Sequence, residues 1–207
     1  MAVSRWTRRL VLTALLASGP PAAFPALAHA APLGNRPGAS ATAGETSLPQ
    51  GAARFALPQP VMLVNASTGK CLTIAGGVST ENNVTALQYT CDDHPSRRWL
   101  LRDVTGTGVY QVRNVGTGKC LTIAGGVSTE NNVTALQYTC DSHPSRRWTL
   151  TDVTGNGQYQ VRNVGTGKCL TIAGGVSTEN NVTALQYTCD DHPSRRWLLR
   201  LTGQLYG

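Results

Sequence analysis

The chain has 207 residues, enough for one well-buried domain with extensions but too few for two large domains. Only 14% of the residues are charged and 22 are glycine, a composition that favours strands and turns over amphipathic helices. The formal net charge of +7, part of which comes from Arg5, Arg8 and Arg9, is too small to indicate nucleic-acid binding.

The first thirty residues have the features of an export signal. The basic segment SRWTRRL precedes a short apolar run, and Ala28 and Ala30 supply the small residues that signal peptidase recognises. We therefore expect residues 1–30 to be a signal peptide, for the Sec or the twin-arginine route, and the mature protein to be secreted. The apolar run is too short to span a bilayer and no later segment is apolar enough, so we expect no membrane insertion.

Residues 31–57 are rich in Ala, Gly, Pro, Ser and Thr and have scarcely any apolar periodicity. This composition predicts a disordered leader or linker. The folded domain is therefore expected over residues 58–207.

A repeat dominates the rest of the chain. The string TGKCLTIAGGVSTENNVTALQYTC begins at Thr68, at Thr117 and at Thr166, with a period of 49 residues. Such self-similarity indicates units that bury their apolar faces against one another. Within a unit, short apolar and β-branched runs alternate with Gly, Asn, Asp and Pro turns, which predicts about four strands. Because no copy is an atypical end unit, we expect an all-β, pseudo-threefold closed barrel.

Six cysteines occupy equivalent places in the three repeats. In an exported protein an even number at regular spacing indicates disulfides, each contributing roughly 3 kcal/mol here. Pairing within each repeat is the scheme that treats all copies alike without crossing the barrel. The predicted bridges are Cys71–Cys91, Cys120–Cys140 and Cys169–Cys189. A zinc site is the alternative, although the chain lacks short C-x-x-C pairs.

Each repeat has a Cys followed by a short apolar strand, an aromatic residue two places before the second Cys, and a Trp about eight to ten places further on. In the first repeat these are Cys71, Tyr89, Cys91 and Trp99. This pattern resembles the ricin B-type β-trefoil lectins and the family-13 carbohydrate-binding modules of secreted bacterial proteins. The resemblance covers about residues 58–207. It implies a β-trefoil, a six-stranded barrel capped by three hairpins, with one potential sugar pocket per repeat and the Trp in the core.

The resemblance singles out three positions of each repeat: a stacking aromatic, an aspartate that holds sugar hydroxyls in galactose binders, and the glutamine of a Q-x-W motif. Here the aromatic is retained as tyrosine, whereas the aspartate is replaced by threonine and the glutamine by arginine. The residues are Tyr89, Tyr138 and Tyr187; Thr73, Thr122 and Thr171; and Arg97, Arg146 and Arg195.

A tyrosine offers a flat apolar face to a pyranose and a hydroxyl for a hydrogen bond, and asparagines and a replacement carboxylate complete the expected site. The candidates grouped with Tyr89 are Thr73, Asn82, Asn83, and Asp92 or Asp93; those of the other repeats are Thr122, Asn132 and Asp141, and Thr171, Asn181 and Asp190. Each has a structural alternative: packing for the tyrosine, a turn with positive φ for the asparagines, and a cap of the next turn for the aspartates.

Two further residue types have alternative interpretations. Arg97 is expected to replace the structural glutamine and to hydrogen-bond a turn, and the alternative is bidentate binding of an anionic sugar. His94, His143 and His192 are threefold related, so a shared metal site is the alternative to solvated histidines in turns.

No enzyme is expected, because catalytic groups normally occur in one asymmetric place and nearly every polar residue here occurs three times. The sequence predicts a secreted, monomeric, carbohydrate-binding protein without a cofactor or a metal. Up to three weak, equivalent sites would act multivalently on a polysaccharide or a cell-surface glycan. The alternatives are a protein-binding trefoil, such as a protease inhibitor, and a scaffold with degenerate pockets. The first of these would need one unique exposed loop.

Overall fold

The computed structural model describes residues 59–202. This part of the chain contains twelve strands in three repeated units. The expected signal peptide, residues 1–30, and the expected linker, residues 31–57, lie outside the described residues. Each unit contributes four strands, as the sequence predicts, and one short 3₁₀ turn. Within residues 59–202 no helix is long and apolar enough to cross a bilayer.

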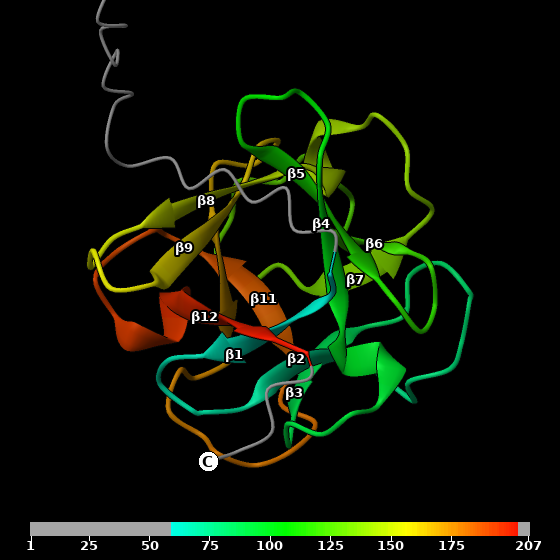
Figure 1. Cartoon of the computed structure of the whole chain (residues 1–207). Helices are drawn as coiled ribbons and strands as arrows, with labels where there is room; N and C mark the ends of the chain where they lie inside the picture. Colours follow the sequence, from blue (N-terminus) through cyan, green and yellow to red (C-terminus); the bar gives the residue numbers. More distant parts are fainter. Residues whose placement is uncertain (1–58, 203–207) are drawn as a thin grey trace, which may run out of the picture. The chain divides into compact units, whose positions relative to one another are not determined.

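Six of the strands form a closed antiparallel barrel (Figure 1). Neighbours pair in the order β1, β4, β5, β8, β9, β12, and β12 pairs again with β1. Their bounds are β1 Val61–Asn65, β4 Trp99–Asp103, β5 Val109–Asn114, β8 Trp148–Asp152, β9 Gln158–Asn163 and β12 Arg196–Leu201. Closure leaves the barrel strands without free edges.

The other six strands form three hairpins that cap the barrel. They are β2 Cys71–Ile74 with β3 Ala86–Tyr89, β6 Cys120–Ile123 with β7 Ala135–Tyr138, and β10 Cys169–Ile172 with β11 Ala184–Tyr187. Single β-bridges link the three hairpins to one another, and each hairpin is followed by a 3₁₀ turn: η1 Pro95–Arg97, η2 Pro144–Arg146 or η3 Pro193–Arg195. A six-stranded barrel with three capping hairpins is the β-trefoil that the sequence predicts.

Burial alternates along strand β5 of the barrel. Tyr110, Val112 and Asn114 are buried, whereas Gln111 and Arg113 face outward to different degrees. Successive side chains of a strand point to opposite faces, so one set enters the core.

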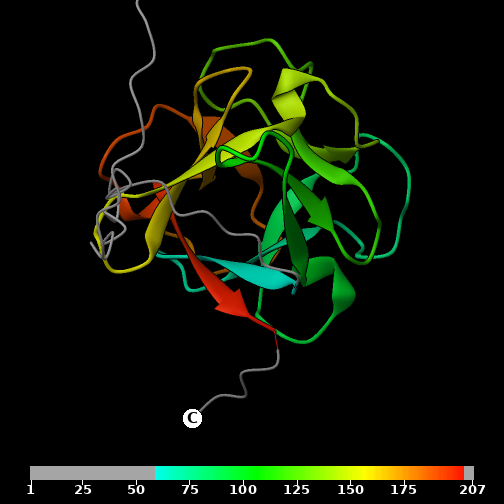
Figure 2. The same ribbon diagram turned by 45° about the horizontal axis from the view of Figure 1, so that its top comes forward.

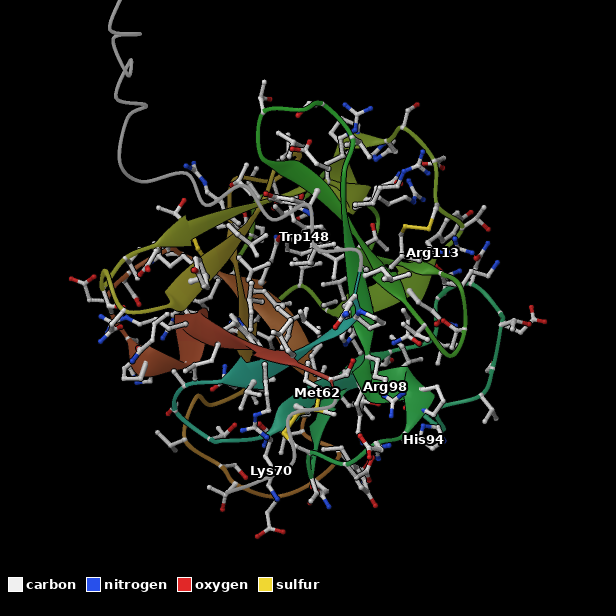
Figure 3. The ribbon with its side chains drawn as sticks, viewed as in Figure 1. Met62, Lys70, His94, Arg98, Arg113 and Trp148 are labelled. Carbon is white, nitrogen blue, oxygen red and sulfur yellow. A yellow bond between two sulfur atoms is a disulfide. The ribbon has the colours of Figure 1, made fainter. Side chains whose placement is uncertain are left out.

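Three tryptophans fill the centre of the barrel, one from each repeat. Trp99, Trp148 and Trp197 are fully buried, and the indole Nε1 of each donates a hydrogen bond of 3.0 Å to a hairpin carbonyl, that of Leu72 in the case of Trp99. Figure 3 shows Trp148 among the side chains that fill the barrel. A buried indole N–H requires a partner, so each tryptophan also joins the barrel to its hairpin. The predicted core role is confirmed.

The three predicted disulfides are present: Cys71–Cys91, Cys120–Cys140 and Cys169–Cys189. No free cysteine occurs among the described residues, so the zinc alternative is wrong. Each bridge joins the start of a hairpin to the segment just beyond its second strand.

A buried glutamine in each hairpin holds the neighbouring repeat. Gln186 is fully buried, and its Nε2 donates to the carbonyls of Ser128 at 2.8 Å and Glu130 at 2.7 Å, while its Oε1 accepts from Thr166 Oγ1 at 2.7 Å. Gln88 holds the carbonyls of Ser177 and Glu179 in the same way, and Gln137 those of Ser79 and Glu81. We call these three side chains the glutamine clamps.

The barrel closes where the ends of the domain meet. Strand β1 pairs with β12 over five residues, from Val61 opposite Leu201 to Asn65 opposite Trp197, and the two strands lie side by side (Figure 1, Figure 2). At the equivalent places in the barrel, β4 pairs with β5 and β8 pairs with β9, and in each case a loop of the chain joins the two strands. Leu201 accordingly occupies the position that Asp103 has in the first repeat.

Asp103 organises the hairpin between β4 and β5. Its carboxylate accepts from the backbone N–H groups of Thr105 at 2.9 Å, Gly106 at 2.7 Å and Gly108 at 3.0 Å. Asp152 makes the equivalent contacts between β8 and β9. An ionised carboxylate that accepts several backbone N–H groups is stabilised in its charged form.

We expect Gln186→Met to lower the free energy of unfolding by roughly 2–4 kcal/mol, because it removes the three hydrogen bonds of a fully buried side chain at similar side-chain volume. Chemical denaturation measures the change. The same substitution at Gln160, whose Nε2 makes one exposed bond of 2.9 Å to the Asp190 carbonyl, is the control and should cost less than about 1 kcal/mol. Equal losses in the two variants would contradict the role assigned to the clamp.

The two hairpin carboxylates predict a dependence of stability on pH. Burial raises the pKa of Asp103, but its backbone donors outweigh this and hold the pKa below the ordinary 3.8; the Gly157 N–H is the main cause of the lowered pKa of Asp152. Their stabilisation is thus present above about pH 4 and is lost as the pH falls through the lowered values. Asparagine does not titrate, so replacing either aspartate by asparagine removes its part of this pH dependence.

The double variant Asp103→Asn, Asp152→Asn should therefore lose less unfolding free energy than the parent between about pH 4 and pH 2. Denaturant titrations across this range measure it, and each single variant should show part of the difference. Superimposable pH profiles of the parent and the double variant would refute the assignment.

Candidate functional site

Three equivalent pockets lie beside the tyrosines of the hairpins. We call them the first, second and third pocket; they contain Tyr89, Tyr138 and Tyr187 and have volumes of about 330, 360 and 380 Å³. Small-molecule sites begin at about 300 Å³, so each pocket suits a ligand of modest size. The side chains that line the first pocket include Thr73, Ile74, Leu87, Tyr89, His94, Ser96, Arg97 and Asn181.

The asparagines line the pockets of neighbouring repeats. Asn83 lines the second pocket, Asn132 the third and Asn181 the first. The grouping of Asn83 with Tyr89 is therefore wrong. The reason is that the loop before β3 crosses to the next repeat, where the Asn83 N–H donates to the Gln137 carbonyl at 2.9 Å.

The predicted turn conformation of these asparagines is confirmed. Asn83, Asn132 and Asn181 have φ angles of 67°, 66° and 67°, in the left-handed region that asparagine tolerates. Asn82 does not line a pocket. Its Oδ1 instead accepts from the N–H and the hydroxyl of Thr139, at 2.9 and 3.1 Å, and so fastens the loop to the neighbouring repeat.

The threonines form the floor of the pockets. Thr73 is 3% exposed, and its Oγ1 lies 2.9 Å from Ser96 Oγ and 3.3 Å from the Ser96 carbonyl. Thr122 and Thr171 make the same contacts with Ser145 and Ser194. The structure thus places the predicted threonines in the pockets, with their hydroxyls bonded to protein partners.

The histidines also line the pockets, which the sequence interpretation as solvated turn residues missed. His94 precedes Pro95 and caps η1: its Nδ1 accepts from the Ser96 N–H at 3.2 Å and lies 2.8 Å from Ser96 Oγ. Gly77 leaves the room for this ring, because a Cβ there would lie 3.0 Å from His94 Cε1. The order His-Pro-Ser, with proline at the start of a short turn, was the available signal for a cap.

Arg97 packs against Tyr89. Its Cζ lies 4.4 Å from the centroid of the ring, and the side chain is 11% exposed. Arg146 and Arg195 lie over Tyr138 and Tyr187 at 4.2 and 4.4 Å. Such contacts between a guanidinium and an aromatic ring are stabilising, and they fix the orientation of both groups.

The predicted replacement carboxylates are not in the lining of the pockets. Asp92 pairs with Arg97, with 3.1 Å between its Oδ1 and Nη1, and the same oxygen accepts from the His94 N–H at 2.9 Å. Asp141 pairs with Nη1 of Arg146 at 3.2 Å, and Asp190 pairs with Nε of Arg195 at 3.3 Å. The structure therefore gives no support to the expectation that these aspartates replace the anchoring carboxylate. They cap the following turn, the alternative that the sequence left open.

The neighbouring aspartate is also engaged elsewhere. Asp93 pairs with Arg98 at 3.1 Å, outside the first pocket. The expected turn contact of Arg97 is present through Asp92, and its guanidinium lines the pocket as well. Within the described part of the chain no cluster of His, Cys, Asp or Glu is arranged to hold a metal ion, so nothing supports a site shared by the histidines.

Comparisons with solved structures show the same fold. The designed threefold-symmetric protein ThreeFoil is 26% identical, with a TM-score of 0.64 over 68% of this chain and 97% of its own. An exo-β-1,3-galactanase from Clostridium thermocellum, 1,3Gal43A, is 28% identical, with a TM-score of 0.66; the match covers 72% of this chain but only 31% of that enzyme. The Rhizoctonia solani agglutinin is 18% identical, with a TM-score of 0.59 over 72% of this chain and 99% of its own.

A comparison with curated protein sequences finds no match. The model of the ricin-type β-trefoil lectin domain-like family matches three overlapping segments, residues 55–138, 103–175 and 144–206. These matches span the three repeats, the tyrosines and the core tryptophans. The chain therefore belongs to the ricin-type β-trefoil lectin domain-like family.

Proposed function

We propose that this protein is a secreted, carbohydrate-binding, lectin-like protein with up to three weak, equivalent sites. The observation that carries the proposal is that the same pocket, with a half-buried tyrosine beside polar side chains, occurs three times in a domain of a lectin-like family. Three disulfides agree with an oxidising, extracellular compartment.

The lining of each pocket suits a pyranose. In the first pocket Ile74, Leu87 and Tyr89 form an apolar wall, against which the C–H face of a sugar can pack. Arg97 and Asn181 supply polar groups for the hydroxyls. Because Arg97 covers part of the ring of Tyr89, the sugar would contact the portion of the ring that faces the pocket.

Three shallow sites become effective together on a repeating ligand. A pocket with few polar groups provides little binding energy on its own, and linked sites raise the apparent affinity through effective concentration. Identical pockets favour a ligand with a repeated unit, such as a polysaccharide or a glycan-coated surface.

The direct test is binding of the purified, oxidised protein to a panel of plant, fungal and bacterial polysaccharides, followed by calorimetry with oligosaccharides of any that bind. We expect close to three sites per chain. Absence of binding across the whole panel would overturn the proposal.

The tyrosines provide the first prediction. We expect the triple variant Tyr89→Leu, Tyr138→Leu, Tyr187→Leu to lose glycan retention on affinity electrophoresis, because leucine offers no flat face to the sugar. The corresponding triple substitution to phenylalanine keeps the ring and should retain binding within about tenfold. Retention by a folded leucine variant would exclude the proposed site.

Two neighbouring glycines of the second pocket provide a second prediction about the sites. Gly125 and Gly126 both have positive φ, 66° and 73°, but a Cβ at Gly125 meets nothing within 4 Å, whereas one at Gly126 would lie 3.0 Å from Ser145 Oγ and 3.1 Å from His143 Cε1. Both alanine variants carry the backbone cost of roughly 1–2 kcal/mol, and Gly126→Ala adds about 1–3 kcal/mol of overpacking.

Gly126→Ala should therefore reduce the number of sites measured by calorimetry from three to two, while Gly125→Ala keeps three. Denaturation of both variants measures the cost in stability. Loss of a site in Gly125→Ala alone would contradict the assigned geometry.

A further inference from the structure

We propose that the three pockets select saccharides that carry an anionic group, a carboxylate or a sulfate. This inference rests on the proposed function, because it names the ligand class of the same pockets. Its basis is the polarity of the lining: the charged side chain available in each pocket is a cation, and the imidazole beside it offers a hydrogen-bond donor.

None of the residues that line the three pockets is an aspartate or a glutamate. A neutral sugar presents hydroxyls that both donate and accept, so its tight binding needs acceptors in the site as well as donors. In the first pocket the floor residues Thr73 and Ser96 are 3% and 1% exposed; their hydroxyls are bonded to each other, and that of Ser96 also contacts His94. The floor therefore offers few free acceptors.

The cap fixes which nitrogen of each histidine can donate. Nδ1 of His94 accepts from the Ser96 N–H, so the proton of the neutral imidazole is on Nε2. The ring of His94 then has a single free polar group, an N–H donor. His143 and His192 cap their turns with the same geometry. Every pocket thus contains an imidazole N–H that suits a ligand acceptor.

The arginine provides the charge. Arg97 stacks on Tyr89 at 4.4 Å, and its Nη1 pairs with Asp92 at 3.1 Å, so two contacts fix the orientation of the guanidinium. In the second pocket Arg146 pairs through Nη1 as well, at 3.2 Å, and in the third pocket Arg195 pairs through Nε, at 3.3 Å. Asp92 lies outside the lining, and its side chain is 50% exposed, so solvent screens its charge more than it screens that of the nearly buried guanidinium.

A pre-oriented guanidinium loses little conformational entropy when it binds an oxyanion, and carboxylate and sulfate both match its donors. An acidic sugar therefore satisfies the donors of Arg97 and His94, and its ring can still pack against Tyr89. A neutral sugar offers these donors only uncharged hydroxyl oxygens, so the bonds that it accepts from Arg97 lack the charge assistance of an oxyanion, and the lining favours the acidic sugar.

The test compares ligands that differ only in their charge. Calorimetry and affinity electrophoresis are carried out with polygalacturonate and its fully methyl-esterified form, and with dextran sulfate and dextran. We expect the oxidised protein to bind at least one acidic member tenfold or more tightly than its neutral counterpart. The two pairs distinguish a carboxylate from a sulfate ligand.

Variants separate the pocket from general charge attraction. Arg97→Gln, Arg146→Gln, Arg195→Gln together install the family's glutamine and should reduce acidic-glycan binding at least tenfold. The control removes the same number of positive charges outside the pockets, through Lys70→Gln, Lys119→Gln, Lys168→Gln, and should change binding less than threefold. Lys70 bonds Thr90 on the surface at 3.1 Å (Figure 3).

A second triple variant, His94→Asp, His143→Asp, His192→Asp, serves if the arginine variant does not fold. Aspartate is a preferred cap, so the turns should persist while each pocket gains a carboxylate. Acidic-glycan binding should again fall at least tenfold.

Equal affinity for acidic and neutral members of both pairs would overturn the inference and leave the proposed function in place. Equal losses in the arginine and lysine variants would also overturn it, because they would show general charge attraction. Absence of binding to both pairs, together with binding only to neutral polysaccharides of the panel, would likewise overturn the inference alone, whereas absence of binding to the pairs and to the whole panel would remove the proposed function itself.

Discussion

The glutamine clamp is the contact on which the rest of the domain depends. Each hairpin keeps its neighbour's loop in place through two carbonyls held by one buried amide, and Gln88 performs this task between the last repeat and the first. The loop that is held then delivers an asparagine to a pocket, as Asn181 is delivered to the first pocket. The contacts that pack the repeats against one another are therefore also the contacts that complete the pockets. An isolated repeat has neither a closed barrel nor a complete pocket.

Much of the fold could be predicted because its determinants recur along the chain. The period of 49 residues, the cysteine spacing and the short apolar runs between turns predict three four-stranded units, their disulfides and a closed barrel. The clamp could not be predicted with the same ease. Gln88 shares a strand face with Ala86, but nothing local indicates that this face is buried or that its amide reaches the carbonyls of another repeat.

The candidate site was predicted only in part, for a related reason. Tyr89 and Thr73 lie in paired strands of one hairpin, so residues close in sequence are also close in the pocket. Asn83 is near Tyr89 in sequence and yet lines another pocket, since a loop that crosses between repeats separates neighbours along the chain. The orientation of Arg97 depends on two partners at once, and residue types alone do not indicate that a guanidinium will stack on a ring and still face a cavity.

Closure by β1 and β12 has a consequence for how such a chain assembles. These strands pair without a covalent turn between them, and each repeat presents nearly the same surfaces to its neighbours. A repeat from another molecule can therefore occupy the place of the chain's own, which makes domain-swapped oligomers a competing product at high protein concentration. The bridges within repeats, such as Cys71–Cys91, fix each hairpin but not the repeat against which it packs, so dilution during refolding is expected to disfavour swapped oligomers.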